Sequence, residues 1–360
     1  MIAIVLSVVL AGAGAGPCPG SITARPDLAR EAAGAITADQ EPVSGLQGHR
    51  LGADQIRVMA AEATPETLGV NGAAERYAWV ETAQGPVIVL EACGLGDSAL
   101  ALMAGESYLE WTGPGFHLAR PRELVAGTGF ETHLFDSTAL GASREVYLHV
   151  PEGWDGTRGD PVIVSGDGLA GSSFARIAET LMHEGRIRPV AFASARFGEG
   201  WIAGAGTDQR SAEYLVPADS AAPARIEAYQ RHETFFFDEF LPYIIEQLGG
   251  ETGPVYAFGL SASATFALEQ GLKRPDLISA VIAGSPPLTA RTRALAAEAD
   301  PALRVHLWCG DFEPVFCAPL AEFAHATGFL LETRRAAHAS ALWEEALAAS
   351  LLERAPPRAD

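Results

Sequence analysis

The amino-acid sequence predicts an α/β fold: a mostly parallel sheet with helices on both faces, preceded by a small accessory domain. Short apolar runs alternate with helical stretches over residues 124–355, which is typical of parallel strands joined by crossover helices. Hydrophobic residues make up 48% and charged residues 19% of the 360 residues, a composition that allows a sizeable core. One apolar run passes directly into a helical stretch through a Gly-x-Ser turn, where we expect the chemistry to lie.

The first residues indicate export. Residues 1–15 form a short apolar run followed by small residues, which predicts a secretory signal peptide cleaved after Ala15. The run is shorter than the roughly 20 residues of a membrane span, so we expect a periplasmic or extracellular protein without stable membrane insertion. A buried N-terminal strand or helix is the alternative. Residues 16–50, rich in Ala, Gly, Pro and Asp, predict a linker.

Residues 51–123 predict a small accessory domain in which we find no chemistry. Its clearest elements are two strand-like runs, 77–82 and 87–91, which flank Ala-Gln-Gly-Pro at 83–86 and predict a β-hairpin.

The catalytic domain is expected over residues 124–355. Runs 131–135 and 144–150 predict two antiparallel strands, and alternating elements follow. The expected strands are 161–165, 190–194, 255–258, 280–283, 305–309 and 329–333, and the expected helices are 172–184, 225–248, 262–273, 288–299, 318–327 and 340–352.

Charge and cysteines narrow the possible functions. The net charge of −20 repels phosphate, so we expect no nucleic-acid partner. Four cysteines are compatible with two disulfides, with Cys309–Cys317 and Cys18–Cys93 as the simplest pairing. No C-x-x-C or Cys/His cluster occurs in the sequence, so we expect no metal and no cofactor. The oligomeric state is left open.

The Gly-x-Ser turn predicts a nucleophile. The run Val-Tyr-Ala-Phe-Gly-Leu-Ser-Ala-Ser begins at Val255 and places Ser261 between a strand and a helix, which is the arrangement of a nucleophile elbow. The backbone N–H of Ala262 can then stabilise an oxyanion. The motif usually closes with Gly, but Ser263 stands there. The alternative is a serine that only caps a helix.

Candidates for the acid and the base follow in the order that such folds require. Residues 310–314 read Gly-Asp-Phe-Glu-Pro after a strand, so Asp311 and Glu313 both qualify as the acid by spacing. His338 follows the last expected strand and precedes the final helix, and its imidazole could accept the serine proton. His183, His232 and His325 fall inside expected helices, with His325 expected to face solvent.

Five motifs in order, over roughly residues 130–352, resemble the enterochelin esterase and esterase-D-like group of α/β hydrolases. They are Asp167-Gly168 after a strand, Arg-x-x-Glu-Tyr at 210–214, Phe-Leu-Pro-Tyr-Ile at 240–244, Gly-x-x-Glu-Pro at 310–314, and His338 with Trp343. Two departures are Ser263 in place of Gly and Ala336-Ala337 in place of Gly-Gly.

The resemblance implies an α/β-hydrolase fold and a role for each matching residue. It favours Glu313 as the acid, assigns Gly168 and Leu169 to the loop that lines the oxyanion hole, and places Trp343 beside the substrate. Arg210 is expected to bind an anionic part of the substrate, or else to form a structural ion pair with Glu213.

Three functions are compatible with these residues. The first is hydrolysis of a small-molecule carboxylic ester through an acyl-enzyme, with a Ser261, His338 and Glu313 triad. The second is a catalytically inactive binding protein with the same fold, and the third is acyl transfer to an alcohol. Siderophore esters, feruloyl esters and simple acyl esters are all open, although the acidic chain disfavours a strongly anionic substrate.

Overall fold

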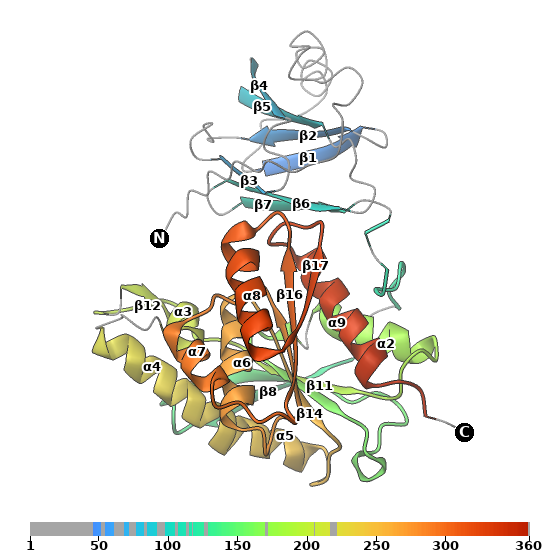
Figure 1. The fold of residues 1–360 in the computed structure, drawn as a ribbon, viewed down its shortest axis with the longest axis vertical. Helices are drawn as coiled ribbons and strands as arrows, with labels where there is room; N and C mark the ends of the chain where they lie inside the picture. Colours follow the sequence, from blue (N-terminus) through green and yellow to red (C-terminus); the bar gives the residue numbers. More distant parts are fainter. Residues whose placement is uncertain are drawn as a thin grey trace. The chain divides into compact units, whose positions relative to one another are not determined.

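The computed structural model describes residues 46–358 except 52–54, 61–67, 72–76, 83–84, 92–97, 105–106, 113–114, 117, 126–128, 170–171, 205 and 217–221. The chain forms two compact units (Figure 1). The first combines the strands before residue 118 with two later segments, Gly310–Pro314 and Arg334–Leu342. The second contains Leu118–Cys309, Val315–Thr333 and Trp343–Asp360.

An eight-stranded sheet organises the second unit and has the order β17-β16-β15-β14-β10-β11-β9-β8. Strands β11, β10, β14, β15 and β16 run parallel, whereas β9 and β8 complete one edge in antiparallel fashion. The bounds are β8 Glu131–Ser137, β9 Ala142–His149, β10 Val162–Ser165, β11 Ala191–Ala195, β14 Val255–Leu260, β15 Ala280–Gly284, β16 Arg304–Gly310 and β17 Leu330–Arg334. The predicted α/β-hydrolase fold is therefore confirmed.

Helices cover both faces of this sheet (Figure 1). Helices α2 (Ser173–His183) and α9 (Ser340–Arg354) share one face, where Ser173 Oγ donates to Glu344 at 2.7 Å. The other face carries α3 Gln209–Tyr214, α4 Pro223–Thr234, α5 Leu241–Gln247, α6 Ala262–Lys273, α7 Ala290–Ala296 and α8 Pro314–Thr327. A short β-hairpin, β12 (Trp201–Ile202) with β13 (Thr207–Asp208), leads into α3.

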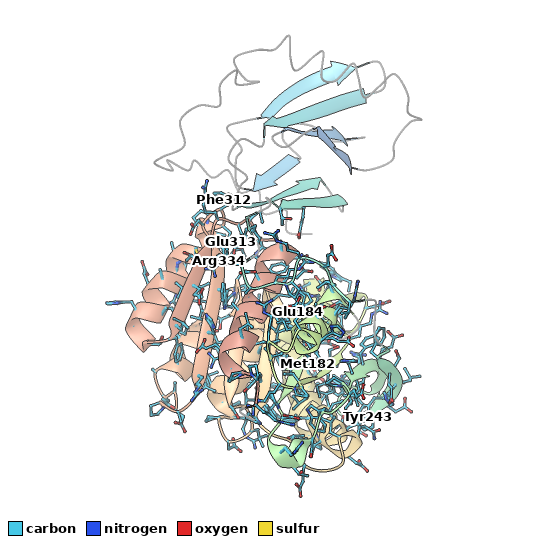
Figure 2. All side chains as sticks on the ribbon, turned by 90° about the vertical axis from the view of Figure 1, so that its right-hand side faces the viewer. Met182, Glu184, Tyr243, Phe312, Glu313 and Arg334 are labelled. Carbon is cyan, nitrogen blue, oxygen red and sulfur yellow. A yellow bond between two sulfur atoms is a disulfide. The ribbon has the colours of Figure 1, made fainter. Side chains whose placement is uncertain are left out.

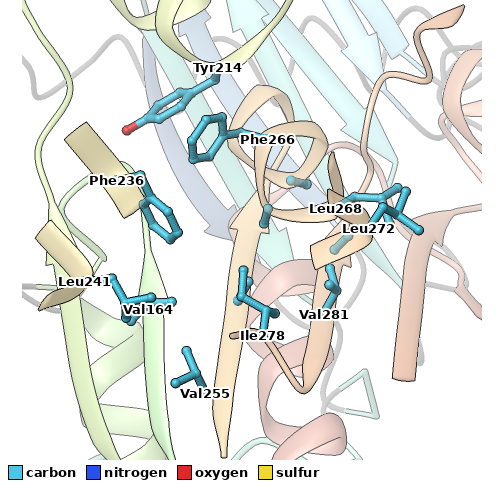
Figure 3. Close-up of a cluster of buried hydrophobic side chains, with 14 of the residues drawn as sticks. Val164, Tyr214, Phe236, Leu241, Val255, Phe266, Leu268, Leu272, Ile278 and Val281 are labelled. Atoms are coloured by element: carbon cyan, nitrogen blue, oxygen red, sulfur yellow. The ribbon is translucent and has the colours of Figure 1, made fainter. Parts of the chain in front are cut away.

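Strand residues alternate between the two faces, so each face has its own apolar layer. Val164 and Val255 pack with Phe236, Phe266 and Leu268 beneath the larger helical layer (Figure 3). On the opposite face Phe258 contacts Phe174 of α2, with ring centroids 5.3 Å apart. This two-sided burial explains why the central strands read as continuous apolar runs.

The single helix expected over 225–248 is interrupted. Residues Phe235–Phe240 form a π-helical segment between α4 and α5, in which the N–H of Leu241 reaches the carbonyl of Phe236. Pro242 has no N–H, so the α-helical bond to residue 238 cannot form and the wider turn is accommodated there.

The first unit contains two small antiparallel sheets, β1-β2-β5-β4 and β3-β6-β7. The bounds are β1 Leu46–Leu51, β2 Gln55–Ala60, β3 Leu68–Asn71, β4 Tyr77–Thr82, β5 Gly85–Glu91, β6 Ala99–Ala104 and β7 Ser107–Thr112. Strands β4 and β5 pair as the expected hairpin. Strand β1 begins within the segment 16–50 for which we expected a linker.

Of the two expected disulfides, Cys309–Cys317 is present, with the Cα atoms 5.4 Å apart. The expected signal peptide and the Cys18–Cys93 pair lie outside the described residues. In the part of the chain that the structure describes, none of the helices has the length and apolarity needed to span a membrane.

Candidate active site

Strand β14 ends in the tight turn that the sequence predicted. Ser261 has φ +54° and ψ −123°, a conformation that L-residues rarely adopt and that is typical of a strained nucleophile turn. The N–H of Ser261 donates to the carbonyl of Gly284 at 2.8 Å, which ties the turn to β15. A Cβ at Gly259 would lie 2.3 Å from the carbonyl oxygen of Ser263. Glycine is therefore required there, and Ser261 is held where β14 meets α6.

Ser263, the departure from the usual Gly, links this turn to a second loop. Its Oγ donates to Asp167 Oδ2 at 2.6 Å and accepts from the N–H of Leu260 at 3.1 Å. Asp167 follows β10, the neighbour of β14 in the sheet, and has φ +59°. The serine thus connects the carboxyl ends of two adjacent parallel strands, an edge at which ligands bind in many open α/β sheets.

Arg210 completes the support of Asp167. Its Nε and Nη2 donate to the two carboxylate oxygens at 2.6 and 2.8 Å, a bidentate ion pair. Burial lowers the pKa of Arg210, but the hydrogen bonds and the charge of Asp167, with smaller contributions from Tyr214 and Asp208, together raise the pKa above its ordinary value. Tyr214, from the same helix α3, accepts the N–H of Asp167 at 2.9 Å.

The alternative expected for Arg210, an ion pair with Glu213, is wrong, although Arg210 does form an ion pair. Glu213 pairs with Arg144 at 2.6 Å and accepts from Gln209, and Arg210 pairs with Asp167. Both residues lie on the six-residue helix α3, but each side chain bonds to a different partner from outside this helix, Asp167 for Arg210 and Arg144 for Glu213. The expected role of Arg210 in substrate binding stays a prediction.

The expected oxyanion loop, residues 167–169, makes internal hydrogen bonds. The N–H of Gly168 donates to the carbonyl of Ala195 at 3.1 Å, so this bond argues against Gly168 as an oxyanion donor. The N–H of Leu169 makes a longer bond, 3.4 Å, to the carbonyl of Gly166. A Cβ at Gly166 would lie 2.6 Å from the Tyr214 hydroxyl, so this glycine lets the tyrosine approach the loop.

Glu313 and His338 form a close pair within the first unit. Glu313 Oε2 lies 2.6 Å from His338 Nδ1, and Glu313 Oε1 accepts the N–H of Gly310 at 2.7 Å. The glutamate side chain is 3% exposed and the imidazole 24% exposed. A buried carboxylate bonded to one ring nitrogen fixes the orientation and the tautomer of an imidazole.

Backbone hydrogen bonds hold the glutamate turn against the histidine loop, which we define as Arg334–Leu342. The N–H groups of Asp311 and Phe312 donate to the carbonyls of Arg334 and Ala336 at 2.8 and 3.0 Å. Figure 2 labels Phe312, Glu313 and Arg334 in this region. The Asp311 side chain is exposed, in contrast to that of Glu313.

The other residues singled out in the sequence are Trp343 and three further histidines, and they differ in burial. Trp343 is buried, and its indole N–H donates to Ser285 Oγ at 3.3 Å. A Cβ at Gly284 would lie 2.4 Å from the indole, so the tryptophan packs directly on the end of β15. His183 and His325 are exposed and His232 is buried. Among the described residues, no three His, Cys, Asp or Glu side chains gather as a metal site would need.

Comparison with known proteins identifies the family. A family model named Esterase and described as "Putative esterase" matches residues 137–354, more than half of the chain. The chain belongs to this esterase family. It is thus a carboxylic ester hydrolase, as the sequence motifs predicted.

Solved esterase structures share the fold at low sequence identity. The enterochelin esterase of Shigella flexneri is 14% identical, with a TM-score of 0.61 over 88% of this chain and 98% of that one. The ferric enterobactin esterase of Salmonella typhimurium is also 14% identical, with a TM-score of 0.55 over 86% of this chain and 95% of that one. No curated protein matches this esterase significantly.

Sequence reasoning missed three residues that support the site. In the sequence, Ser263 stands out only because it replaces the usual Gly of the nucleophile motif. Tyr214 is noted only as the final residue of the Arg-x-x-Glu-Tyr motif. Glu110 lies in the accessory region, where no motif pointed to it, yet it accepts the N–H of Ser340 in the histidine loop at 2.6 Å. Hydrogen bonds between distant segments leave no local signal in a sequence.

Proposed function

We propose that this esterase cleaves its ester by a serine mechanism, with Ser261 as the nucleophile, His338 as the general base and Glu313 as the acid. In the first step Ser261 Oγ forms a bond to the ester carbonyl carbon while the imidazole takes its proton. Collapse of the tetrahedral intermediate expels the alcohol, which receives that proton from the imidazolium. Water then attacks the acyl-enzyme, releases the carboxylic acid and restores the serine.

The observation that carries the proposal is the Glu313–His338 pair, together with the strained turn at Ser261. The 2.6 Å bond from Nδ1 to a buried carboxylate leaves Nε2 as the nitrogen that handles the proton. The positive φ of Ser261 is a strained backbone that such folds adopt to expose the nucleophile.

The oxyanion is assigned to the N–H groups of Ala262 and Leu169. Ala262 is the first residue of α6, whose N-terminus carries a partial positive charge. Leu169 follows the loop that Asp167 anchors, and its N–H is less strongly engaged than that of Gly168. Two such donors are worth about 10²–10³ in rate each when aimed at the developing charge.

Replacement of Ser261 tests the proposal. Ser261→Ala should abolish turnover of a short p-nitrophenyl ester, since it removes the hydroxyl that attacks the carbonyl carbon, and circular dichroism should show an unchanged fold. Wild-type protein should be labelled stoichiometrically at Ser261 by a fluorophosphonate probe, as read by peptide mass spectrometry. Full activity in the variant, or a wild-type protein that turns over the ester without labelling, would contradict the serine mechanism.

The substrate is a separate question. Structures of the Shigella flexneri relative were determined in the presence of enterobactin and of 2,3-dihydroxy-N-benzoyl-serine, at 14% identity to this chain. Enterobactin therefore belongs in the first screen, beside feruloyl and simple acyl esters. A net charge of −20 opposes the approach of a highly anionic ester, so a neutral ester is our expected best substrate.

Export forms the last part of the proposal. The apolar run before Ala15 supports it, and so does the Cys309–Cys317 disulfide, because such bonds persist in oxidising compartments. Intact mass spectrometry of the protein from periplasm or medium should show a chain that begins near residue 16. A chain that stays in the cytoplasm at full length would contradict export.

A further inference from the structure

Within the first unit, strands β6 and β7 hydrogen-bond to the histidine loop. We propose that these strands act as a clamp on the loop and that Glu110 is a positioning residue for His338. The inference rests on the proposed function, in that His338 is the base, and it assigns a role to a region whose sequence shows no chemistry.

The amino end of β6 pairs with the loop as a strand would. The N–H of Ala99 donates to the carbonyl of Arg335 at 2.9 Å, and its carbonyl accepts the N–H of Ala337 at 3.0 Å, which gives a parallel bridge between Ala99 and Ala336. On its other edge β6 pairs with β7, where Ala99 lies opposite Thr112. The loop therefore pairs with the same edge of β6 that β3 pairs with further along the strand. The residues just before His338 are thus held by main-chain bonds.

Small apolar side chains reinforce this pairing. Ala101 of β6 packs with Ala337 and Ala339, the two neighbours of His338, and all three are 1% exposed or less. Ala336 is also fully buried. The Ala336-Ala337 departure from Gly-Gly therefore supplies methyl groups to this contact, and it stiffens the backbone beside the base because alanine has fewer backbone conformations than glycine.

Glu110 holds the other side of the loop. Its Oε1 and Oε2 accept the N–H groups of Ser340 and Ala341 at 2.6 and 3.3 Å. These are the first two residues of α9, whose N-terminal N–H groups lack carbonyl partners within the helix. A carboxylate there satisfies them and also interacts favourably with the helix dipole.

The two contacts come from one face of a single hairpin. Ala101 and Glu110 are direct cross-strand partners in β6 and β7, so their side chains project on the same side. One contact ends at Ala337 and the other begins at Ser340, with His338 between them. Because both flanks are fixed, the imidazole has little freedom to leave the orientation that Glu313 sets.

Substitution of Glu110 tests the clamp in the full-length protein. Glu110→Ala should lower kcat for a p-nitrophenyl ester about tenfold to a hundredfold with little change in KM, because small misplacements of a catalytic group have effects of that size. Glu110→Gln, which keeps one good acceptor, should lose less. If Glu110→Ala does not fold, Glu110→Gln carries the test.

A matched control separates positioning from general stability. Asp155→Ala removes a different helix cap, in which Asp155 Oδ1 accepts the N–H of Thr157 at 3.0 Å on the chain before β10. It should leave kcat unchanged, and any fall in melting temperature shows how much a lost cap matters alone. Equal kcat in Glu110→Ala, Asp155→Ala and wild type would overturn the clamp.

A double-mutant cycle gives the readout that a merely structural role would not move. In a His338→Ala background, where the oxyanion donors still give a residual rate, Glu110→Ala should have no further effect. If it lowers that residual rate by the same factor as in wild type, Glu110 does not act through His338 and the inference is wrong. If instead Ser261→Ala keeps full activity, the proposed function itself fails, independently of Glu110.

Discussion

The nucleophile turn and the histidine loop are supported by different kinds of interaction. Around Ser261 the support comes from buried polar side chains, chiefly the Asp167 carboxylate with Arg210 and Ser263. Around His338 it comes from main-chain pairing with β6, small methyl groups and one carboxylate, Glu110. The nucleophile turn is thus held by side-chain hydrogen bonds and an ion pair. The histidine loop is held mainly by main-chain hydrogen bonds to a strand that is distant in the sequence.

This difference has consequences for how the two regions tolerate change. A buried ion pair fails when one partner is removed, because the other is left as an uncompensated charge. Main-chain pairing survives most side-chain substitutions and is sensitive to bulk at its alanines. The predictions below therefore aim at side-chain chemistry in both regions.

The largest effect is expected at the acid. Glu313→Gln should lower kcat/KM about 10³–10⁴-fold, as when the carboxylate of a serine-protease triad becomes an amide. The amide can offer an N–H to Nδ1 and so favour the wrong tautomer. Steady-state kinetics on a p-nitrophenyl ester measure the loss, with circular dichroism to confirm the fold.

Asp311→Asn is the matched control for that experiment, since Asp311 is the other acidic residue of the same turn and is exposed. It should leave kcat/KM unchanged. A large loss in Asp311→Asn with near-normal rates in Glu313→Gln would transfer the acid to Asp311 and contradict the role of the 2.6 Å pair.

How far the sequence predicts the site also differs between the regions. The turn at Ser261 depends on neighbours in the chain, such as Gly259, so a local motif identifies it. Spacing alone did not separate Asp311 from Glu313, because the choice depends on which side chain turns inward toward His338. The contacts of Asp167 with Ser263 and of Glu110 with Ser340 join residues 96 and 230 positions apart, and no local pattern announces them.

The fold follows the same rule. The central parallel strands were predicted to within a few residues because burial on both faces makes them uniformly apolar. Most strands of the first unit were not predicted, and β1 lies where a linker was expected. The π-helical segment Phe235–Phe240 was also missed, since only the position of Pro242 hints at it.

A smaller effect is expected at Ser263, where the nucleophile turn meets the Asp167 loop. Ser263→Ala removes a hydrogen bond to a carboxylate, worth about 1.5–3 kcal/mol. Loss of this bond should shift the oxyanion loop, residues 167–169, and we expect kcat/KM to fall about tenfold as a result. Kinetics and thermal unfolding measured together separate a rate effect from a stability effect.

Thr265→Val provides the comparison for Ser263. Thr265 lies two residues further along α6, is fully buried and donates to the carbonyl of Pro287 at 2.8 Å. Its loss should lower the melting temperature without changing kcat/KM. If both variants lose activity equally, the effect at Ser263 reflects general loosening of α6 rather than support of Asp167.

The smallest effect is expected in the response of stability to pH, and it concerns helix α3, which carries Arg210 and Tyr214. His232 packs on the Tyr214 ring, with centroids 5.1 Å apart, and its Nδ1 lies 3.7 Å from Glu213 Oε2. Burial lowers the pKa of His232 below its ordinary 6.5, against the opposing charge of Glu213. The unfolded chain therefore binds a proton more readily than the folded one as the pH falls through 6.5.

Stability should consequently decrease from pH 7.5 to pH 5.5, and His232→Gln should flatten that slope by removing one such group. The lowered pKa of Glu213 acts in the same direction, but only around and below its ordinary value of 4.5, outside this window. Thermal unfolding of both proteins at the two pH values measures the difference, with His325→Gln as a control because His325 is exposed. If the melting temperatures of wild type and His232→Gln fall equally from pH 7.5 to pH 5.5, protonation of His232 does not affect stability. The polar contacts around α3, which support the nucleophile turn, would then be as insensitive to acid as the main-chain pairing of the histidine loop.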